Sequence, residues 1–202
     1  MHTVQEPNMS TITQKALSPL ATLLFSLVWP GPVVAAPGSA KAPTSVDYKT
    51  PGKKTEDLPN FHVVHPYLYR GGEPTAAGLK LLGQKGVKTV IDLRAASFRT
   101  KAEAEQAQAL GMKHINLPMS AKAPTASQQA TFIAAVEEGQ KSNEPVFVHC
   151  AHGSDRAGCM VGIWRVTHDG YTYADAYKEM RKYYFGPQFR ELSGAVQKRV
   201  VH

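Results

Sequence analysis

The chain has 202 residues, of which 43% are hydrophobic and 19% are charged, and its formal net charge at pH 7 is +7. This composition is typical of a globular protein and excludes a largely disordered chain. The positive charge favours anionic substrates without identifying them. Because no long Lys/Arg run and no alternation of aromatic and basic residues accompanies the charge, we do not expect a nucleic-acid-binding protein.

The first forty residues have the pattern of an export signal. Lys15 precedes an apolar stretch from Leu20 to Trp29, and the small residues that follow resemble signal-peptidase sites. The apolar stretch is too short for a stable membrane span. We therefore predict a signal peptide over residues 1–40, export to the periplasm, and a flexible linker over residues 41–58, which are rich in Lys, Pro, Thr, Gly and Asp.

A folded catalytic domain is expected over residues 59–202, where segments with strand and helix patterns alternate. Strands are predicted at 61–64, 67–69, 87–93, 113–117 and 146–149. Helices are predicted at 75–85, 100–110, 125–141, 158–168 and 172–184, with a last helical segment after Pro187. This alternation predicts an α/β fold with a mainly parallel sheet.

The most informative segment runs from His149 to Arg156 and reads HCAHGSDR. An apolar strand leads into it, and a glycine-containing helical pattern leads out. A tight loop at a helix N-terminus gathers backbone N–H groups around one point, which favours both a phosphate dianion and a thiolate. Together with a cysteine nucleophile and an arginine that can donate two N–H groups to phosphate oxygens, this arrangement is typical of a phosphoryl-transfer site.

The segment resembles the His-Cys-x5-Arg signature of cysteine-dependent protein tyrosine phosphatases, in particular the small bacterial, dual-specificity branch. Two upstream segments agree with this resemblance. Tyr69 to Pro74 (YRGGEP) is similar to a YR-small-x-Q-P segment of that branch, and Val90 to Arg94 is similar to its VIDLR strand end. The resemblance covers roughly Phe61 to Val200 and implies a three-layer fold, in which helices flank the central sheet.

The resemblance also implies a role for each residue of the loop. Cys150 attacks phosphorus and forms a phosphocysteine, which water hydrolyses without a metal or another cofactor. Arg156 clamps the phosphate oxygens, and His149 bonds to the loop backbone and helps to keep the cysteine ionised. Gly153 is expected to adopt a backbone turn closed to other residues. The residues expected to bind substrate are Ala151, His152, Gly153, Ser154, Asp155 and Arg156.

Two features depart from the family pattern. Ala157 stands where relatives have a Ser or Thr whose hydroxyl assists hydrolysis of the phosphoenzyme, so we expect the attack step to survive and turnover to be slow. The second departure concerns the general acid, which many relatives carry as an aspartate on a separate loop. The corresponding loop here, residues 118–124, contains no carboxylate.

Three residues are candidates for the missing acid. Asp155 lies in a Gly-x-Asp-Arg pattern similar to that of myotubularin-type lipid phosphatases, and its alternative role is a helix N-cap. His152 competes with it. Asp92 lies at the end of a strand, but Arg94 two residues later favours a structural ion pair for this aspartate.

Other side chains have plainer interpretations. Four basic residues could lie around the entrance of the substrate pocket: Arg94, Arg99, Lys101 and Lys122. For each of them individually, however, we expect a solvated position on the surface. Cys159 is the second of the two cysteines. One possibility is a regulatory disulfide between Cys159 and the nucleophile Cys150, but we favour the interpretation that Cys159 packs as a small apolar side chain.

The sequence therefore predicts an exported cysteine-dependent phosphatase that hydrolyses phosphate monoesters. Its partners would be phosphotyrosine or phosphoserine proteins, or small anionic phosphomonoesters. Two alternatives share the same site: a phosphoinositide or inositol phosphate phosphatase, and a phosphate-binding pseudophosphatase with little turnover. A thiol-redox or sulfurtransferase protein ranks last, because that chemistry does not need Arg156.

Overall fold

The computed structural model describes residues 56–199. The predicted signal peptide, over residues 1–40, and nearly all of the predicted linker lie outside the described residues. At the end of the predicted linker range, Asp57 accepts a hydrogen bond from the Thr75 N–H (3.0 Å), and Leu58 packs against a buried apolar cluster. No helix within the described range is long and apolar enough to cross a membrane.

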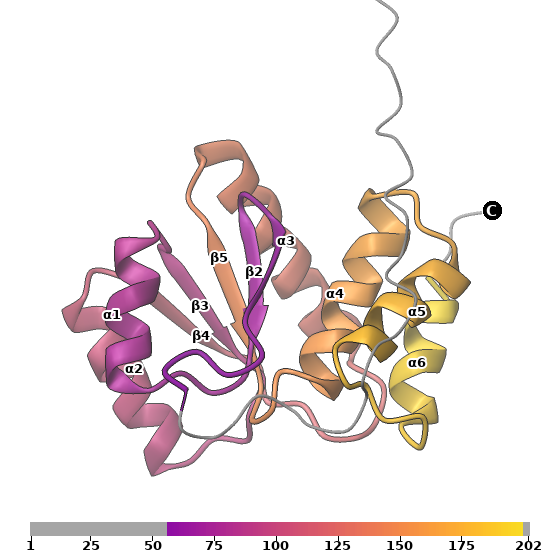
Figure 1. Ribbon diagram of the computed structural model, residues 1–202, viewed down its shortest axis with the longest axis horizontal. Helices are drawn as coiled ribbons and strands as arrows, with labels where there is room; N and C mark the ends of the chain where they lie inside the picture. Colours follow the sequence, from indigo (N-terminus) through magenta and orange to yellow (C-terminus); the bar gives the residue numbers. More distant parts are fainter. Residues whose placement is uncertain (1–55, 200–202) are drawn as a thin grey trace, which may run out of the picture. The chain divides into compact units, whose positions relative to one another are not determined.

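Strands and helices alternate along the described residues (Figure 1). The strands are β1 (His62–His65), β2 (Leu68–Gly71), β3 (Thr89–Asp92), β4 (Lys113–Asn116) and β5 (Val146–His149). The helices are α1 (Ala76–Gln84), α2 (Phe98–Ala109), α3 (Ala126–Ser142), α4 (Asp155–His168), α5 (Tyr173–Lys182) and α6 (Arg190–Gln197). Every predicted element is present, and the largest shift is the start of α4, which begins three residues earlier than predicted.

Helix capping explains several of these boundaries. Thr125 and Gln128 form the predicted capping box of α3, in which the Thr125 hydroxyl accepts from the Gln128 N–H (3.2 Å) and the Gln128 side chain accepts from the Thr125 N–H (2.8 Å). Thr172 accepts from the Asp175 N–H (3.2 Å) and caps α5, also as predicted. These bonds satisfy N–H groups that have no partner inside the helix.

The sheet brings the ends of three distant segments together. Its strand order is β1-β2-β5-β3-β4, and all neighbours are parallel except the β1–β2 pair at one edge. Gly71 at the end of β2 and Asp92 at the end of β3 both pair with His149 at the end of β5. The carboxyl ends of parallel strands form the usual binding edge of an α/β sheet, so this edge is where a site is expected.

Helices cover both faces of the sheet, which confirms the three-layer α/β fold. In Figure 1, α1 and α2 lie on one side and α3 to α6 on the other. Residues of β5 alternate between the two sides: Val146 and Val148 belong to the larger core under α3 to α6, whereas Phe147 belongs to the smaller core under α1 and α2. The central strand is thus buried on both faces and fixes where the following loop emerges.

Candidate active site

Cys150 follows β5 directly, and the loop that it begins runs into α4. The cysteine is almost fully buried, with 2% of its surface exposed. Gly153 in the loop has a φ of +74°, which confirms the predicted turn, and a Cβ there would lie 2.5 Å from the carbonyl carbon of Gly71. The loop is therefore held against the end of β2 by a contact that only glycine permits.

Four consecutive carbonyl groups, those of residues 151–154, point out of the loop and accept hydrogen bonds from neighbouring segments. In loop order, the donors are the Glu73 N–H (3.3 Å), Asn60 Nδ2 (3.2 Å) and Arg70 Nη2 (2.7 and 3.4 Å). In a planar trans peptide the N–H points opposite to the C=O, so the N–H groups of residues 152–155 face the inside of the loop. With the N-terminus of α4, they form a concave donor surface suited to an anion.

Arg156 is half-buried and does not project freely into solvent. Its Nη1 donates to the carbonyl oxygens of Leu93 (3.2 Å) and Met119 (3.4 Å). The guanidinium thus links the loop between β5 and α4, called the phosphate loop below (residues 150–155), to the end of β3 and to the loop of residues 118–124. These two bonds fix the position of a planar cation that can donate two N–H groups to an anion.

Arg70 and Asn60 are functional candidates that sequence reasoning missed. Arg70 is completely buried in β2, and its guanidinium carbon lies 5.0 Å from the centre of the Tyr183 ring. Asn60 has a φ of +50° and also bonds to His62 (2.9 Å). Both residues hold loop carbonyls from outside. The sequence signal for Arg70 was the YR segment, in which the arginine had no assigned role, whereas Asn60 lies outside every segment that carried the resemblance.

His149 has a different partner from the one expected. Its Nε2 lies 2.8 Å from Oε1 of Glu103 on α2, and its Nδ1 has no hydrogen-bond partner among residues 56–199. The expected bond from this histidine to the loop backbone is therefore not formed. Burial opposes ionisation of Glu103, but hydrogen bonds from His114 and His149 and the charge of Arg94 hold the pKa of this carboxyl at about 2.

Arg94 is the centre of a buried ion network and not a surface charge, so that prediction was wrong. Its Nη2 donates to Asp92 (2.7 Å) and to Glu103 (2.6 Å), and its Nη1 pairs with Glu73. The ion pair expected for Asp92 is present. Oxygen and nitrogen atoms of Asp92, Glu103 and His114 come within 4.8 Å of one another. The Arg94 guanidinium bonds to both carboxylates and already neutralises their charge. These residues therefore do not fit a metal ion.

The structure separates the candidate acids. Asp92 is completely buried, and both of its carboxylate oxygens accept hydrogen bonds from the Arg94 guanidinium, so its role at the edge of the site is structural. Asp155 is the first residue of α4; Ser154 occupies the N-cap position, so the N-cap alternative for Asp155 was wrong. One Asp155 oxygen accepts from the Gly186 N–H (2.8 Å). His152 is exposed.

Glu73 is a further carboxylate beside the loop. Its N–H bonds to the Ala151 carbonyl, and its side chain accepts from Arg99 (2.7 Å) as well as from Arg94. The sequence contained a signal for this residue, because a glutamate stands where the similar bacterial segment has glutamine. Arg99, Lys101 and Lys122 are all exposed as expected, and Arg99 is also paired with Glu73.

The residues after the loop belong to the core. Ala157 is fully buried, and so is Cys159, whose Sγ lies 3.3 Å from the Leu192 carbonyl oxygen of α6. Burial raises the pKa of the Cys159 thiol to about 12. Both cysteines are free thiols, and the contacts of Cys159 agree with the packing role that we favoured.

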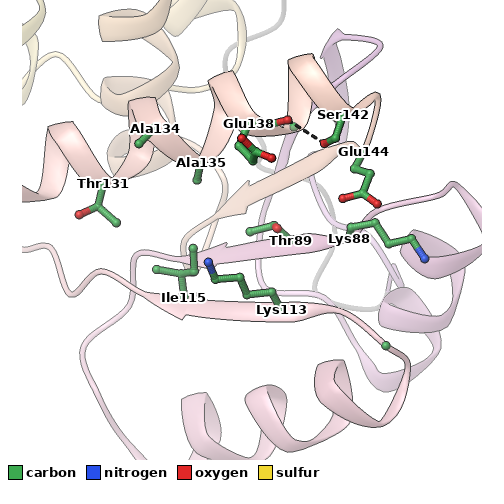
Figure 2. Close-up of a pocket in the computed structure, with 12 residues that line it drawn as sticks. Lys88, Thr89, Lys113, Ile115, Thr131, Ala134, Ala135, Glu138, Ser142 and Glu144 are labelled. Carbon is green, nitrogen blue, oxygen red and sulfur yellow. Dashed lines mark hydrogen bonds between the residues drawn. The ribbon is translucent and has the colours of Figure 1, made fainter.

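A separate hollow of about 790 Å³ lies between β4 and α3 (Figure 2). Lys88, Lys113 and Glu144 line it near the amino ends of the strands. Because Cys150 follows the carboxyl end of β5, this hollow lies at the other edge of the sheet and contributes no residue to the phosphate loop.

Sequence comparison agrees with this geometry. A family described as "DSP-PTPase phosphatase fused to NAD+ Kinase" matches residues 53–197. Dual specificity protein phosphatase TpbA of Pseudomonas aeruginosa (strain UCBPP-PA14) is 26% identical over 180 residues, which cover 88% of this chain and 78% of TpbA. NAD kinase 2, chloroplastic, of Arabidopsis thaliana is 33% identical over 103 residues, which cover 48% of this chain and 10% of that protein.

Solved structures share the fold. TpbA of P. aeruginosa superposes with a TM-score of 0.60 at 21% identity, over 73% of this chain and 89% of that one. It has also been solved in complex with pTyr. Tk-PTP in its active form gives a TM-score of 0.61 at 17% identity, over 70% of this chain and 98% of that one. The loop geometry and the family match together place this chain in the DSP-PTPase phosphatase family, within the cysteine-dependent protein tyrosine phosphatase superfamily.

Proposed function

We propose that this chain hydrolyses phosphate monoesters through a phosphocysteine on Cys150. The observation that carries the proposal is the orientation of the loop. Its carbonyls at residues 151–154 are bonded to outside groups, so its N–H groups face the point where Cys150 and Arg156 meet a phosphate. An enclosed ring of donors of this kind stabilises charge that builds up on equatorial phosphate oxygens during transfer.

The reaction proceeds in two displacements. The Cys150 thiolate attacks phosphorus, a sulfur–phosphorus bond forms, and the ester phosphorus–oxygen bond breaks. The leaving oxygen takes a proton from a general acid, for which we propose Asp155, with His152 as the competitor. Water then attacks the phosphocysteine, releases inorganic phosphate and regenerates the thiolate.

The proposed substrates are phosphotyrosine or phosphoserine proteins, or small anionic phosphomonoesters. The complex of TpbA with pTyr supports phosphotyrosine among these classes, because the similarity to TpbA extends over most of this chain. The net charge of +7 supports anionic substrates in general. A panel of phosphopeptides, phosphoinositides and inositol phosphates, tested with the purified protein, would rank these classes.

We further propose that the protein is exported to the periplasm, on the basis of the signal pattern in residues 1–40. Cell fractionation followed by mass spectrometry of the mature N-terminus tests this proposal. A full-length chain that stays in the cytoplasm would contradict it.

Hydrolysis of an aryl phosphate by wild type and by Cys150→Ser tests the covalent mechanism. We expect the serine variant to lose activity while its circular dichroism spectrum stays unchanged, and we expect a chelator to have no effect. Cys159→Ala is the matched control, because it also removes one thiol and should retain activity. Activity in the Cys150→Ser variant would contradict the mechanism.

A phosphate-binding protein with little turnover is the second candidate. Two observations favour it: Ala157 carries no hydroxyl, and residues 118–124 carry no carboxylate. Rapid-quench measurements separate the two functions. An enzyme gives steady release of phosphate, a slow enzyme accumulates phosphocysteine after a burst, and a binding protein gives neither.

A further inference from the structure

Arg70 is a buried cation directly behind the phosphate loop. It is the third residue of β2, and none of its surface is exposed. Its Nη2 donates to the carbonyl oxygens of Gly153 (2.7 Å) and Ser154 (3.4 Å). The other two nitrogens, Nε and Nη1, have no hydrogen-bond partner among residues 56–199. Two loop carbonyls therefore satisfy only part of its donors.

Arg70 also lacks an acidic partner within the described part of the chain. Buried Arg94 and half-buried Arg165 do have acidic partners: Arg94 pairs with Asp92 and Glu103, and Arg165 pairs with Asp169 and Glu179. No ion pair of residues 56–199 includes Arg70. A buried charge without a counter-charge is costly, so a nearby anion is needed to explain why an arginine stands here.

The surroundings of Arg70 offer one such anion. The Arg70 guanidinium lies 5.0 Å from the centre of the Tyr183 ring, and His62 of β1 stacks on the same ring with centroids 3.9 Å apart. Glu179 of α5 attracts Arg70 but is bonded to Arg165 (3.0 Å). Burial lowers the pKa of Arg70, and the negative charges of Glu179 and of the Cys150 thiolate oppose this shift. Because Glu179 is already paired with Arg165, the Cys150 thiolate is the candidate counter-charge for Arg70.

We propose that Arg70 is the internal counter-charge of the active site. It is a positioning residue: it holds two loop carbonyls from behind, so that the loop N–H groups face inward, and its charge stabilises the Cys150 thiolate and a bound phosphate. Arg156 approaches from another direction, beside Leu93 and Met119. Two arginines on different sides of one loop would then share the charge of the substrate. This inference rests on the proposed role of Cys150 as the nucleophile.

Alkylation of Cys150 by iodoacetamide, followed by mass spectrometry as a function of pH, tests the proposal without turnover. Cys159 is buried and protonated to high pH, so it does not interfere. Arg70→Gln removes the charge and keeps a donor for the carbonyls, whereas Arg70→Lys keeps the charge. We expect the glutamine variant to shift the midpoint of the alkylation curve upward by about one pH unit, and the lysine variant by less than half as much.

Protection of Cys150 by inorganic phosphate gives a second readout. We expect Arg70→Gln to weaken this protection by about tenfold, and Arg70→Lys to retain most of it. Leu82→Ala is the control for lost stability, because it opens a cavity in the core under α1, away from the loop. If the glutamine variant does not fold, Arg70→Met is the neutral variant.

A neutral variant whose midpoint and phosphate protection equal those of Leu82→Ala would overturn the proposal and leave Arg70 as a structural residue only. Failure of the proposed function looks different. If the alkylation midpoint shifts between wild type and Arg70→Gln but wild type hydrolyses no phosphate ester, the role of Arg70 as counter-charge is supported and the phosphatase activity is not.

Discussion

The carboxylate of Glu103 on α2 accepts a hydrogen bond from Nε2 of His149 at the end of β5, across 2.8 Å, and both side chains are buried. An ionised carboxylate can only accept, so Nε2 carries a proton, and Nδ1 has no hydrogen-bond partner in the described residues. The helix that follows the VIDLR segment thus sets the tautomer of the residue before Cys150.

Glu103→Gln should lower the free energy of unfolding by about 3 kcal/mol, because the amide cannot accept from both His149 and Arg94 and leaves a buried charge under-compensated. Urea unfolding measures this change. Glu105→Gln removes an exposed carboxylate from the same helix, and it should cost less than about 0.5 kcal/mol. A similar decrease in the free energy of unfolding in the two variants would show that the bond between Glu103 and His149 does not contribute measurably to stability.

Asp155→Asn should separate two roles of this side chain. The asparagine oxygen can still accept from the Gly186 N–H, so the loop contact survives while the proton donor is lost. We expect hydrolysis of alkyl phosphates to fall about 100-fold, and that of nitrophenyl phosphate to change little, because only poor leaving groups need a proton. If both substrates lose activity equally, the acid is to be sought at His152 or Glu73.

Ala157→Ser should speed breakdown of the phosphocysteine by about tenfold, the value of one hydrogen bond to the departing thiolate. Rapid-quench lifetimes of the intermediate test this expectation. Ala151→Ser places a hydroxyl elsewhere in the same loop and should leave the lifetime unchanged. An unchanged lifetime in the Ala157 variant would mean that hydrolysis of the intermediate does not depend on this position.

Stability should fall in mildly acidic solution because of His62. Burial, with the charges of Arg70 and Lys182, lowers the pKa of His62 to about 4 from its usual 6.5. Between these values the unfolded chain binds a proton and the folded chain does not, so the free energy of unfolding decreases as the pH drops from 6.5 to 4. We expect a loss of about 1 kcal/mol, allowing for solvent screening at a half-buried side chain.

Thermal unfolding at pH 7 and pH 4.5 measures this effect. His62→Phe keeps a ring against Tyr183 and should reduce the difference in Tm between the two pH values. His168→Gln, which changes an exposed histidine, should not reduce it. An equal pH dependence in wild type and His62→Phe would assign the acid sensitivity to other groups.

Local chemistry was sufficient to predict most of the fold. The capping residues Thr125 and Thr172 set helix starts that depend on bonds three residues away, and the buried strand before Cys150 is readable as an apolar run. The order of the strands and the three layers follow from the alternation of elements and the resemblance. The phosphate loop itself was found because its residues lie in one continuous segment.

The rest of the site depends on which distant segments meet, and no local pattern contains that information. Glu103 sits in an alanine-rich helix, where nothing distinguishes a buried carboxylate from the exposed Glu105. Arg70 lies in a strand whose register against β5 brings it behind Gly153. For Asp155 the sequence left a general acid and a helix N-cap as alternatives, and the contact with Gly186 could not be predicted because it depends on the packing of the α5–α6 connection.

The turns at the amino ends of the strands offer a place to attach a label or another domain. Gly86 and Gly111, before β3 and β4, have positive φ values of 84° and 73°, so these two positions are best kept as glycine, but the space around them is open: apart from their chain neighbours, no atom lies within 4 Å of where their Cβ would be. Cys150 lies at the carboxyl edge of the same sheet. A dye, an affinity tag or a tether joined through these turns would therefore leave the phosphate loop open to bulky substrates, and the molecule could be held on a surface with its chemistry facing outward.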